Sequence, residues 1–233
     1  MVKNKKLNIL SFFSGCGFLD LGFEDAGFNV VYVNEYFKPF LEAYQYARCC
    51  LSYSEPEFGY FNGNIEECLN GPETKKITQI IDILRKRNKG KDLVGFIGGP
   101  PCQSWSEAGA MKGIEDKRGQ LFFDFIRILE AKQPKFFLAE NVSGMLLGRH
   151  SEALENIKEM FRNAGVGYEL SFEMVNACDY NVPQDRKRVI FVGIRKDLGF
   201  KYQFQKPNFP KLTLQEIIYD LKDNVLPALQ YNK

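Results

Sequence analysis

The stretch that decides the fold is residues 7–17, which read LNILSFFSGCG. Residues 7–13 form a short apolar run of the kind that becomes a buried strand. Gly15 and Gly17 follow directly, and glycines there allow a tight turn and a close approach of a ligand to the backbone. A helical pattern comes next, over residues 19–27. A strand, a glycine turn and a helix in this order predict one unit of a layered α/β fold.

Short apolar runs and longer amphipathic runs alternate along the rest of the chain. The predicted strands are residues 28–33, 93–97, 135–139, 168–175 and 188–194, and the predicted helices are residues 38–50, 76–88, 120–131 and 151–163. This alternation predicts an α/β fold with a doubly wound, mostly parallel, Rossmann-like sheet that has helices on both faces. Ligands of such sheets bind at the carboxyl ends of the strands. We therefore expect the functional residues in the loops after residues 13, 33, 97 and 139.

The composition is that of an ordinary globular protein, with 45% hydrophobic and 26% charged residues among 233 and a formal net charge of +2. This charge neither requires nor excludes nucleic acid. A single histidine, and six cysteines without a Cys-x-x-Cys pair, argue against a metal site. We find no signal peptide and no apolar run long enough to span a membrane. We expect one reduced, cytoplasmic domain over residues 1–233, in which every cysteine except Cys102 serves in packing.

The glycine turn favours a nucleoside without phosphates as the ligand. Asp20 stands where a dinucleotide-binding turn has its third glycine, and an acid near a helix start disfavours a pyrophosphate. Glu35 lies about 20 residues after Gly15, where an acidic residue takes ribose hydroxyls in doubly wound folds. Tyr36 beside it is placed to stack on an adenine. These residues favour S-adenosylmethionine over a nicotinamide dinucleotide, although an ordinary glycine turn and a surface glutamate explain them equally well.

A second loop contains the candidate nucleophile. Residues 98–106 read GGPPCQSWS and directly follow the strand predicted at residues 93–97. Two prolines fix the backbone just before Cys102, which holds the sulfur in one place at little entropic cost. A buried structural cysteine more often lies within a strand or a helix. We therefore interpret Cys102 as a nucleophile and the long loop from Gln103 to Arg118 as a lid.

Charged residues accompany two later strands. Glu140 follows the apolar run 135–139. A glutamate at the end of a buried strand is unusual unless it is exposed to solvent or has a functional role. Arg186 and Arg188 lie two residues apart on an extended segment, so they share a face. They can bind phosphate or a base carbonyl and help keep Cys102 as a thiolate. A surface cluster of salt bridges is the alternative interpretation.

Six segments in a fixed order connect these features to a known family: FSGCG, NEY, GGPPCQSWS, DKRGQLFF, ENV and PQDRKR. Together they resemble the motifs of the C5-cytosine DNA methyltransferases, the bacterial modification enzymes in particular. The resemblance extends from about residue 7 to about residue 222. It implies a methyltransferase-type fold, S-adenosylmethionine as cofactor and double-stranded DNA as substrate with base flipping. It also implies a restriction-modification context in the cytoplasm of a prokaryote, at the nucleoid.

The resemblance also implies a role for individual residues. Cys102 is the implied nucleophile, Glu140 the residue that holds N3 and the amino group of cytosine, and Arg188 with Arg186 the contact to the base. The implied cofactor site consists of Phe13, Gly15, Cys16, Gly17, Glu35, Tyr36, Asn64, Ile65, Pro101 and Leu121. The implied DNA-facing loop carries Gln103, Ser104, Ser106 and Arg118.

The sequence departs from the family pattern in three places. Phe18 stands where the family often has a further glycine. Asn64 stands where the family often has an aspartate that accepts from the adenine amino group; its amide oxygen can still accept, so we expect weaker binding rather than loss. The target-recognition region and the last motif, which follow Arg188 in the family, are absent. We therefore expect either a trimmed enzyme or one subunit of a split enzyme whose second chain reads the DNA.

Two rival interpretations stay open. A transfer-RNA cytosine methyltransferase of the same fold shares the Pro-Pro-Cys-Gln and Glu-Asn-Val motifs. The Gly-Gly start and the Trp-Ser end of segment 98–106 look more like the DNA enzymes. The second rival is a non-catalytic binding or regulatory subunit that kept the fold. Intact Cys102, Glu140 and Arg188 argue against it.

Overall fold

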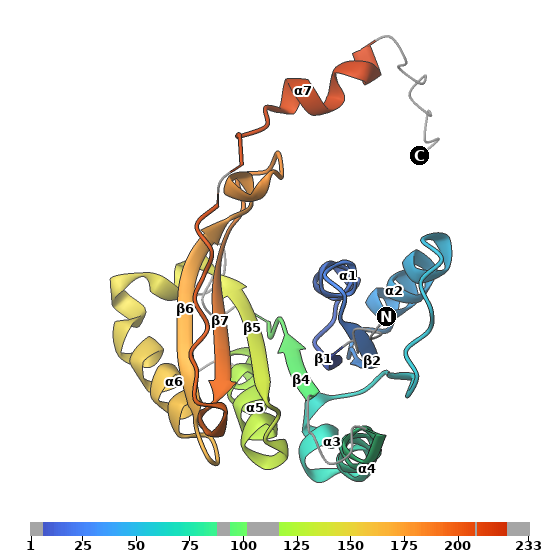
Figure 1. The fold of residues 1–233 in the computed structure, drawn as a ribbon, viewed down its shortest axis with the longest axis vertical. Coiled ribbons are helices and arrows are strands. Elements are labelled where there is room, and N and C mark those ends of the chain that lie inside the picture. The colour runs from blue at the N-terminus through green and yellow to red at the C-terminus, as the bar shows by residue number, and fades with distance from the viewer. Residues whose placement is uncertain (1–6, 88–93, 102–116, 208, 223–233) are drawn as a thin grey trace.

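A computed structural model of the chain describes residues 7–87, 94–101, 117–207 and 209–222, and for residues 117–120 and 149 it describes the backbone alone. The described part contains a seven-stranded sheet (Figure 1). Its strands are β1 (Asn8–Phe12), β2 (Asn29–Asn34), β3 (Tyr60–Phe61), β4 (Val94–Gly98), β5 (Phe136–Val142), β6 (Tyr168–Asn176) and β7 (Lys187–Arg195). The spatial order is β3-β2-β1-β4-β5-β7-β6. Strand β7 pairs antiparallel with both β5 and β6, and the other pairs are parallel.

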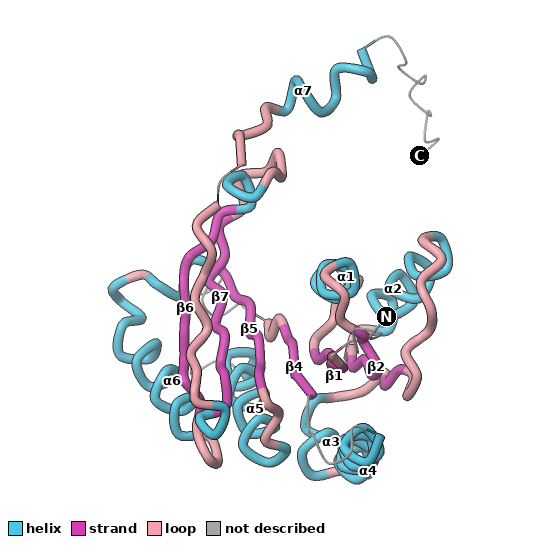
Figure 2. Tube along the Cα trace, in the orientation of Figure 1, coloured by secondary structure: helices cyan, strands magenta, loops and turns pink. Residues whose placement is uncertain are grey.

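Helices cover both faces of the sheet. They are α1 (Phe18–Asp25), α2 (Lys38–Cys50), α3 (Ile65–Asn70), α4 (Pro72–Arg87), α5 (Lys117–Lys132), α6 (Ser151–Asn163) and the short α7 (Leu214–Ile218). In Figure 2, α1 and α2 lie on one side of β1 and β2, and α3 and α4 lie on the other. The predicted doubly wound, mostly parallel α/β sheet is therefore confirmed. No described helix is both long and apolar enough to cross a lipid bilayer.

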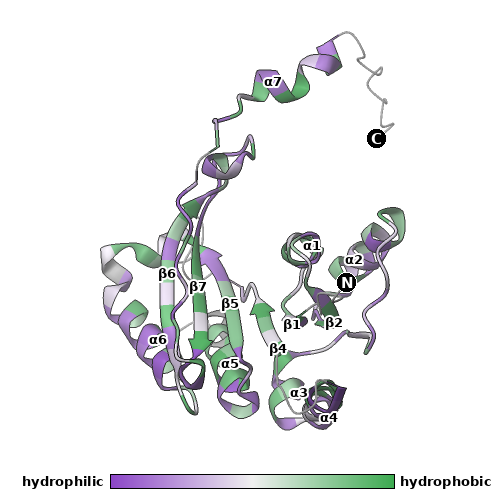
Figure 3. Cartoon of the chain, in the orientation of Figure 1, coloured by the Kyte–Doolittle hydropathy of each residue, from purple (hydrophilic) through white to green (hydrophobic). Residues whose placement is uncertain are grey.

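The apolar residues form two separate clusters. The larger joins the central strands to α3, α4, α5 and α6, with Phe96, Phe125 and Phe137 among its fully buried members. The smaller cluster packs Leu41 and Tyr44 of α2 against β2. In Figure 3, β4 and β7 are coloured mainly apolar, whereas α2, α6 and α7 carry mixed colours. The sheet is thus fixed from both faces, which holds its carboxyl edge in place.

The structure adds two elements to the prediction and shifts the boundaries of others. Strand β3 and helix α3 were not predicted, and α4 begins at Pro72 rather than at residue 76. Helix α3 has a local signal: the Asn64 amide oxygen accepts from the Glu66 N–H, and the Glu67 carboxylate accepts from the Asn64 N–H. Strand β3 has only two residues, too few for a periodic pattern to appear.

The end of the strand predicted at residues 135–139 also differs, and this difference concerns Glu140. The predicted strand ends at residue 139, whereas β5 continues to Val142, so Glu140 lies inside the strand and not in a loop after it. The extra length comes from antiparallel pairing, in which Glu140 lies opposite Ile190 and Val142 opposite Arg188. A partner strand some 50 residues away along the chain is invisible to a local pattern.

The cysteines also differ from expectation. Of the five described cysteines, all are free thiols, but only Cys68 is buried. Cys16 and Cys178 are partly buried, and Cys49 and Cys50 are exposed at the end of α2. The buried face of that helix is formed by Leu41, Tyr44 and Arg48, and Cys49 and Cys50 lie off this face. The prediction that all five serve in packing is wrong for the two exposed thiols.

One buried carboxylate lies between β1, α1 and α2. Asp20 is 0% exposed and accepts hydrogen bonds from Ser11 Oγ at 2.8 Å and from the Tyr44 hydroxyl at 2.9 Å. Burial raises the pKa of Asp20 from 3.8 to about 7, against the two hydrogen bonds, which lower it. Since the pKa is higher in the folded than in the unfolded chain, folding stability falls as the pH rises from about 4 to about 7.

We therefore expect Asp20→Asn to flatten the pH dependence of stability. Between pH 5 and pH 8 the wild-type chain should lose on the order of 3 kcal/mol more unfolding free energy than the variant does, because only the wild type must ionise this buried group. Urea unfolding at several pH values measures the difference. Asp82→Asn, at a more exposed aspartate of α4, is the matched control and should follow the wild type. Equal pH profiles for the wild type and Asp20→Asn would contradict the assignment.

Candidate active site

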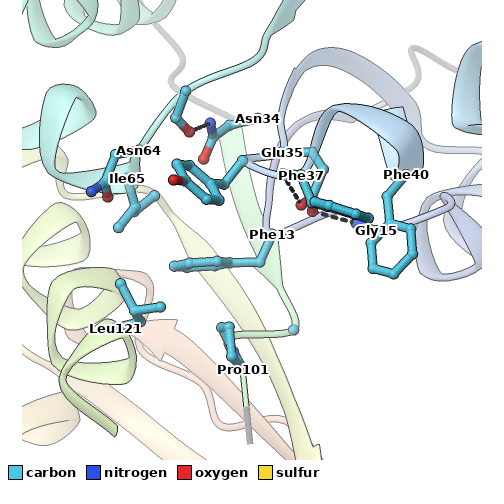
Figure 4. Close-up of a pocket in the computed structure, with 13 residues that line it drawn as sticks. Phe13, Gly15, Asn34, Glu35, Phe37, Phe40, Asn64, Ile65, Pro101 and Leu121 are labelled. Atoms are coloured by element: carbon cyan, nitrogen blue, oxygen red, sulfur yellow. Dashed lines mark hydrogen bonds between the residues drawn. The ribbon is translucent and has the colours of Figure 1, made fainter. Parts of the chain in front are cut away.

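A cavity of about 470 Å³ opens at the carboxyl ends of β1, β2, β3 and β4 (Figure 4). Its volume is typical of a small-molecule site. Its lining comes from the loops after these strands and from α2, α3 and α5: Phe13, Gly15, Asn34, Glu35, Tyr36, Phe37, Phe40, Gly63, Asn64, Ile65, Gly99, Pro101 and Leu121. The cavity therefore lies at the edge of the sheet where the fold predicts a ligand.

Glu35 joins the two loops at the centre of this edge. Its Oε2 accepts from the Gly15 N–H and its Oε1 from the Phe37 N–H, both at 2.8 Å. The side-chain amide of Asn62 donates to the carbonyls of Glu35 and Tyr36, at 2.8 and 2.9 Å. Each carboxylate oxygen keeps a second lone pair that a ligand hydroxyl can use. Glu35 thus holds the glycine turn and still offers acceptors to the cavity.

The rest of the wall is mainly apolar. Phe13 has a φ of +52°, an uncommon backbone conformation for a residue with a side chain. Figure 4 shows its ring lying between Ile65, Leu121 and Pro101. The rings of Phe37 and Phe40 pack edge to face with centroids 4.9 Å apart. An aromatic wall of this kind accommodates a planar base.

The charge of the lining selects among ligands. Among the lining residues that the structure describes, Glu35 is the sole carboxylate, and no lysine or arginine is present. A phosphate would meet a carboxylate and no cation there, which is unfavourable. A nucleoside that carries a positive sulfonium suits this lining better, because its hydroxyls find acceptors and its charge is opposite to that of Glu35. The residues present fit S-adenosylmethionine.

Eight of the ten predicted cofactor residues line the cavity, namely Phe13, Gly15, Glu35, Tyr36, Asn64, Ile65, Pro101 and Leu121. Cys16 and Gly17 do not; they lie behind the turn, in a narrow space shared with Tyr44 of α2. Gly17 has a φ of +89°, and a Cβ there would lie 2.4 Å from the Tyr44 ring. Packing against α2, and not a ligand, therefore explains this glycine.

The sequence missed five lining residues: Asn34, Phe37, Phe40, Gly63 and Gly99. Asn34 has a structural task that links β2 to the next loop, since its amide donates to the carbonyls of Phe61 and Gly63 at 3.2 and 2.9 Å. Gly63 follows the unpredicted strand β3, and its one signal in the sequence was its place directly before Asn64 and Ile65. Phe37 and Phe40 directly follow Glu35 and Tyr36, and that proximity was the available signal.

Three other residues that bear on the cofactor prediction have definite places. Asp20, interpreted as a group that repels phosphate, is turned into the interior and does not line the cavity. Asn64 already accepts from the Glu66 N–H, so one lone pair of its amide oxygen is used inside the protein. Phe18, which replaces a frequent family glycine, is 83% exposed as the first residue of α1.

A second group of charged side chains adjoins the cavity. Arg188 Nε lies 2.8 Å from Glu140 Oε1, and the Arg186 guanidinium lies 4.0 Å from the same oxygen. The two arginines thus share a face, as their spacing predicts, and all three side chains are partly exposed. The residues are both a salt-bridge cluster and a candidate base-binding group.

The chain between the cavity and this cluster is short. A Cβ at Gly99 would lie 3.5 Å from Glu140 Oε2, and the Asn141 amide donates to the Pro100 carbonyl at 3.4 Å. The segment that leads to the predicted nucleophile therefore runs beside Glu140. Cys102, Gln103, Ser104 and Ser106 lie outside the described residues. Arg118, expected in the loop, belongs to the first turn of α5, where only the backbone is described.

Comparison with known proteins agrees with this geometry. The family model of the C-5 cytosine-specific DNA methylases matches residues 7–233. The chain belongs to this family. Type II methyltransferase M.NgoPII of Neisseria gonorrhoeae is 46% identical over 231 residues, which are 97% of this chain and 60% of that protein. Type II methyltransferase M.FnuDI of Fusobacterium nucleatum is 44% identical, with 97% and 59% covered.

Solved structures extend the comparison. A crystal structure described as a DNA modification methyltransferase encoded within an E. coli prophage matches with a TM-score of 0.68 and 26% identity, over 92% of this chain and 55% of that one. The Dnmt2 methyltransferase of S. pombe matches with a TM-score of 0.59 and 20% identity, over 86% and 52%, which shows the fold alone. The chain spans about 60% of the length of the two type II relatives.

The two turn glycines should respond differently to substitution. Gly17→Ala places a Cβ against the Tyr44 ring in a left-handed backbone, so we expect a loss of about 2–4 kcal/mol of unfolding free energy. Gly15→Ala meets open space and carries only the backbone strain, about 1 kcal/mol. Urea unfolding of both variants measures the two losses of unfolding free energy and shows which is larger. An equal or larger loss for Gly15→Ala would show that packing on Tyr44 does not explain Gly17.

Proposed function

We propose that this chain is the catalytic and cofactor-binding part of a DNA (cytosine-5)-methyltransferase that uses S-adenosylmethionine. The observation that supports this most strongly is the position of Glu140. It is paired with Arg188 at 2.8 Å and lies beside the Gly99–Pro100 segment that precedes Cys102. A carboxylate, a guanidinium and the Gly99–Pro100 segment therefore meet next to a cavity that suits a nucleoside.

Different residues of the cavity bind different parts of the proposed cofactor. We assign the ribose hydroxyls to the free lone pairs of Glu35, and the adenine to Tyr36 and the apolar wall formed by Phe13 and Ile65. Asn64 offers the remaining lone pair of its amide oxygen, whose other lone pair caps α3. When bound, S-adenosylmethionine supplies an electrophilic methyl group. The protein must then make a carbon of cytosine nucleophilic enough to accept it.

Cys102 and Glu140 provide that activation. Cytosine C5 is a poor nucleophile. Attack of the Cys102 thiolate on the neighbouring carbon C6 makes C5 electron-rich. A proton held between the Glu140 carboxyl group and N3 neutralises the negative charge that develops on N3 during the attack, so Glu140 acts mainly in the transition state. Arg188 holds the Glu140 carboxylate in position. After the methyl group is accepted, a base removes the C5 proton and the Cys102 sulfur leaves C6.

The reaction requires a cytosine outside the DNA helix, because neither C6 nor N3 can be reached by these side chains within a stacked pair. We therefore include base flipping in the proposal. The net charge of +2 does not mark a strong DNA-binding surface. We propose that sequence recognition is supplied by protein outside residues 1–233, either in the same polypeptide or in a second chain, within a restriction-modification system.

Transfer of labelled methyl from S-adenosylmethionine tests the function directly. Mixed-sequence duplex DNA and transfer RNA are offered to the wild type, to Cys102→Ser and to the control Cys50→Ser, which alters an exposed thiol of α2. We expect label in DNA for the wild type and the control, and none for Cys102→Ser, although it still binds the cofactor. Label in RNA alone would support the transfer-RNA enzyme. If neither substrate takes up label, the same assay is repeated with a longer gene product or with the protein of a neighbouring gene added.

Glu140→Gln should reduce the single-turnover rate of transfer by ~10²-fold or more, the range for a positioned proton-handling group. Cofactor affinity should be unchanged, since Glu140 does not line the cavity. Glu173→Gln is the matched control, because Glu173 on β6 lies opposite Ile190 just as Glu140 on β5 does. If Glu140→Gln lowers the single-turnover rate only a few-fold, or if both variants lower it equally, the activation of cytosine must be assigned to another residue.

A further inference from the structure

The glycine turn has a front and a back. On the front, the Gly15 N–H donates to Glu35 and Gly15 lines the cavity. On the back, Cys16 and Gly17 face the ring of Tyr44, with Gly17 so close that any side chain would overlap the ring. The position of the turn therefore depends on where Tyr44 is held.

Tyr44 is held through its hydroxyl. It is 1% exposed and donates to Asp20 Oδ2 at 2.9 Å, while Asp20 Oδ1 accepts from Ser11 Oγ at 2.8 Å. Burial, and then the neighbouring Asp20 carboxylate, raise the pKa of Tyr44 well above its usual range, so its hydroxyl stays protonated and acts as the donor. Ser11 belongs to β1, Asp20 to α1 and Tyr44 to α2. One carboxylate thus connects the three elements that surround the turn.

The hydrogen-bond network of Ser11, Asp20 and Tyr44 continues to Arg48, which is also held in place. Arg48, which is 2% exposed, forms a two-fold ion pair with Glu24, with N–O distances of 2.6 and 3.0 Å. Its Nε donates to the Ser54 carbonyl at 3.1 Å, and its NH1 lies 3.4 Å from the Tyr44 hydroxyl. Buried polar groups that are fully hydrogen-bonded in this way restrict a region to one arrangement.

No residue of this network lines the cavity, and the catalytic steps use none of them. A buried carboxylate costs free energy unless it is hydrogen-bonded, and an apolar residue would fill the same space without that cost. A role in orientation explains why the polar groups are arranged around the turn.

We propose that Asp20 and Tyr44 are positioning residues, which hold the glycine turn from behind so that the Gly15 N–H and Glu35 present a preformed site to the cofactor. The proposal rests on the proposed function for the identity of the cofactor. The position of the turn itself can be measured without any ligand. Preorganisation of this kind raises affinity because the free protein has less freedom to lose on binding.

Two tyrosine variants test the proposal. Tyr44→Phe keeps the ring against Gly17 and removes the hydroxyl that Asp20 holds. Tyr168→Phe is the matched control, because Tyr168 is 0% exposed and its hydroxyl donates to the Pro134 carbonyl at 2.9 Å, at the opposite edge of the sheet. Both changes delete one buried hydroxyl, so both lower general stability. Only Tyr44→Phe should disturb the turn.

Two readouts separate the outcomes. Amide hydrogen exchange of residues 15–17 without ligand should be about ten-fold faster in Tyr44→Phe and unchanged in Tyr168→Phe. Calorimetric titration with S-adenosylmethionine should show about ten-fold weaker binding for Tyr44→Phe alone. If the wild type binds no S-adenosylmethionine, the proposed cofactor is wrong, and the exchange rates still test the positioning role. Equal exchange rates for wild type and Tyr44→Phe, or equal changes in both variants, would overturn it.

If Tyr44→Phe does not fold, Ser11→Ala removes the other hydrogen bond to Asp20 with a smaller change in volume. The same two measurements apply, and we expect faster exchange of residues 15–17 and weaker binding. Exchange at those residues that matches the wild type would overturn the proposal.

Discussion

The site depends on the hydrogen bonds of one carboxylate, that of Glu35. Parallel strands β1 and β2 end side by side, so the loops after them meet at the same edge of the sheet. Glu35 joins these loops by accepting one backbone N–H from each, from Gly15 and from Phe37. The turn is held in addition by the Ser14 N–H, which donates to the Asn34 carbonyl at 3.2 Å, and from behind by Tyr44. The carboxylate also supplies the negative charge that makes the cavity suit a cationic nucleoside.

The second site is built on a different physical basis. Glu140 lies within β5, and Arg188 lies within the antiparallel neighbour β7, so the rigid sheet sets the distance between the two. Opposite charges in a partly exposed position attract each other modestly, so this pair contributes more to orientation than to stability. The cavity and the pair adjoin at Gly99 and Pro100, so the proposed cofactor site and the proposed base-binding group lie on either side of this short segment.

Asp20 shows how an acid in a motif can be misread. Its place in the sequence suggested a group that repels phosphate, yet its side chain points into the interior and meets Ser11 and Tyr44. The preference for a ligand without phosphate does not depend on it, because the described part of the cavity lining contains Glu35 and no basic residue. Side-chain direction, and not sequence position, decided its role.

Local pattern and motif order alone determined much about this protein. Alternating apolar runs predicted the doubly wound sheet, and the ordered motifs around Gly15, Glu35 and Glu140 predicted the family, because such features lie in short segments that can be recognised one at a time. Tertiary structure decided which side chains face the ligand. Cys16 and Gly17 turned to the back of their loop because of Tyr44, and Glu140 entered β5 because β7 pairs with it. Strand β3, with two residues, exists only through its pairing with β2. These outcomes depend on contacts between segments distant in the sequence, which no local pattern contains.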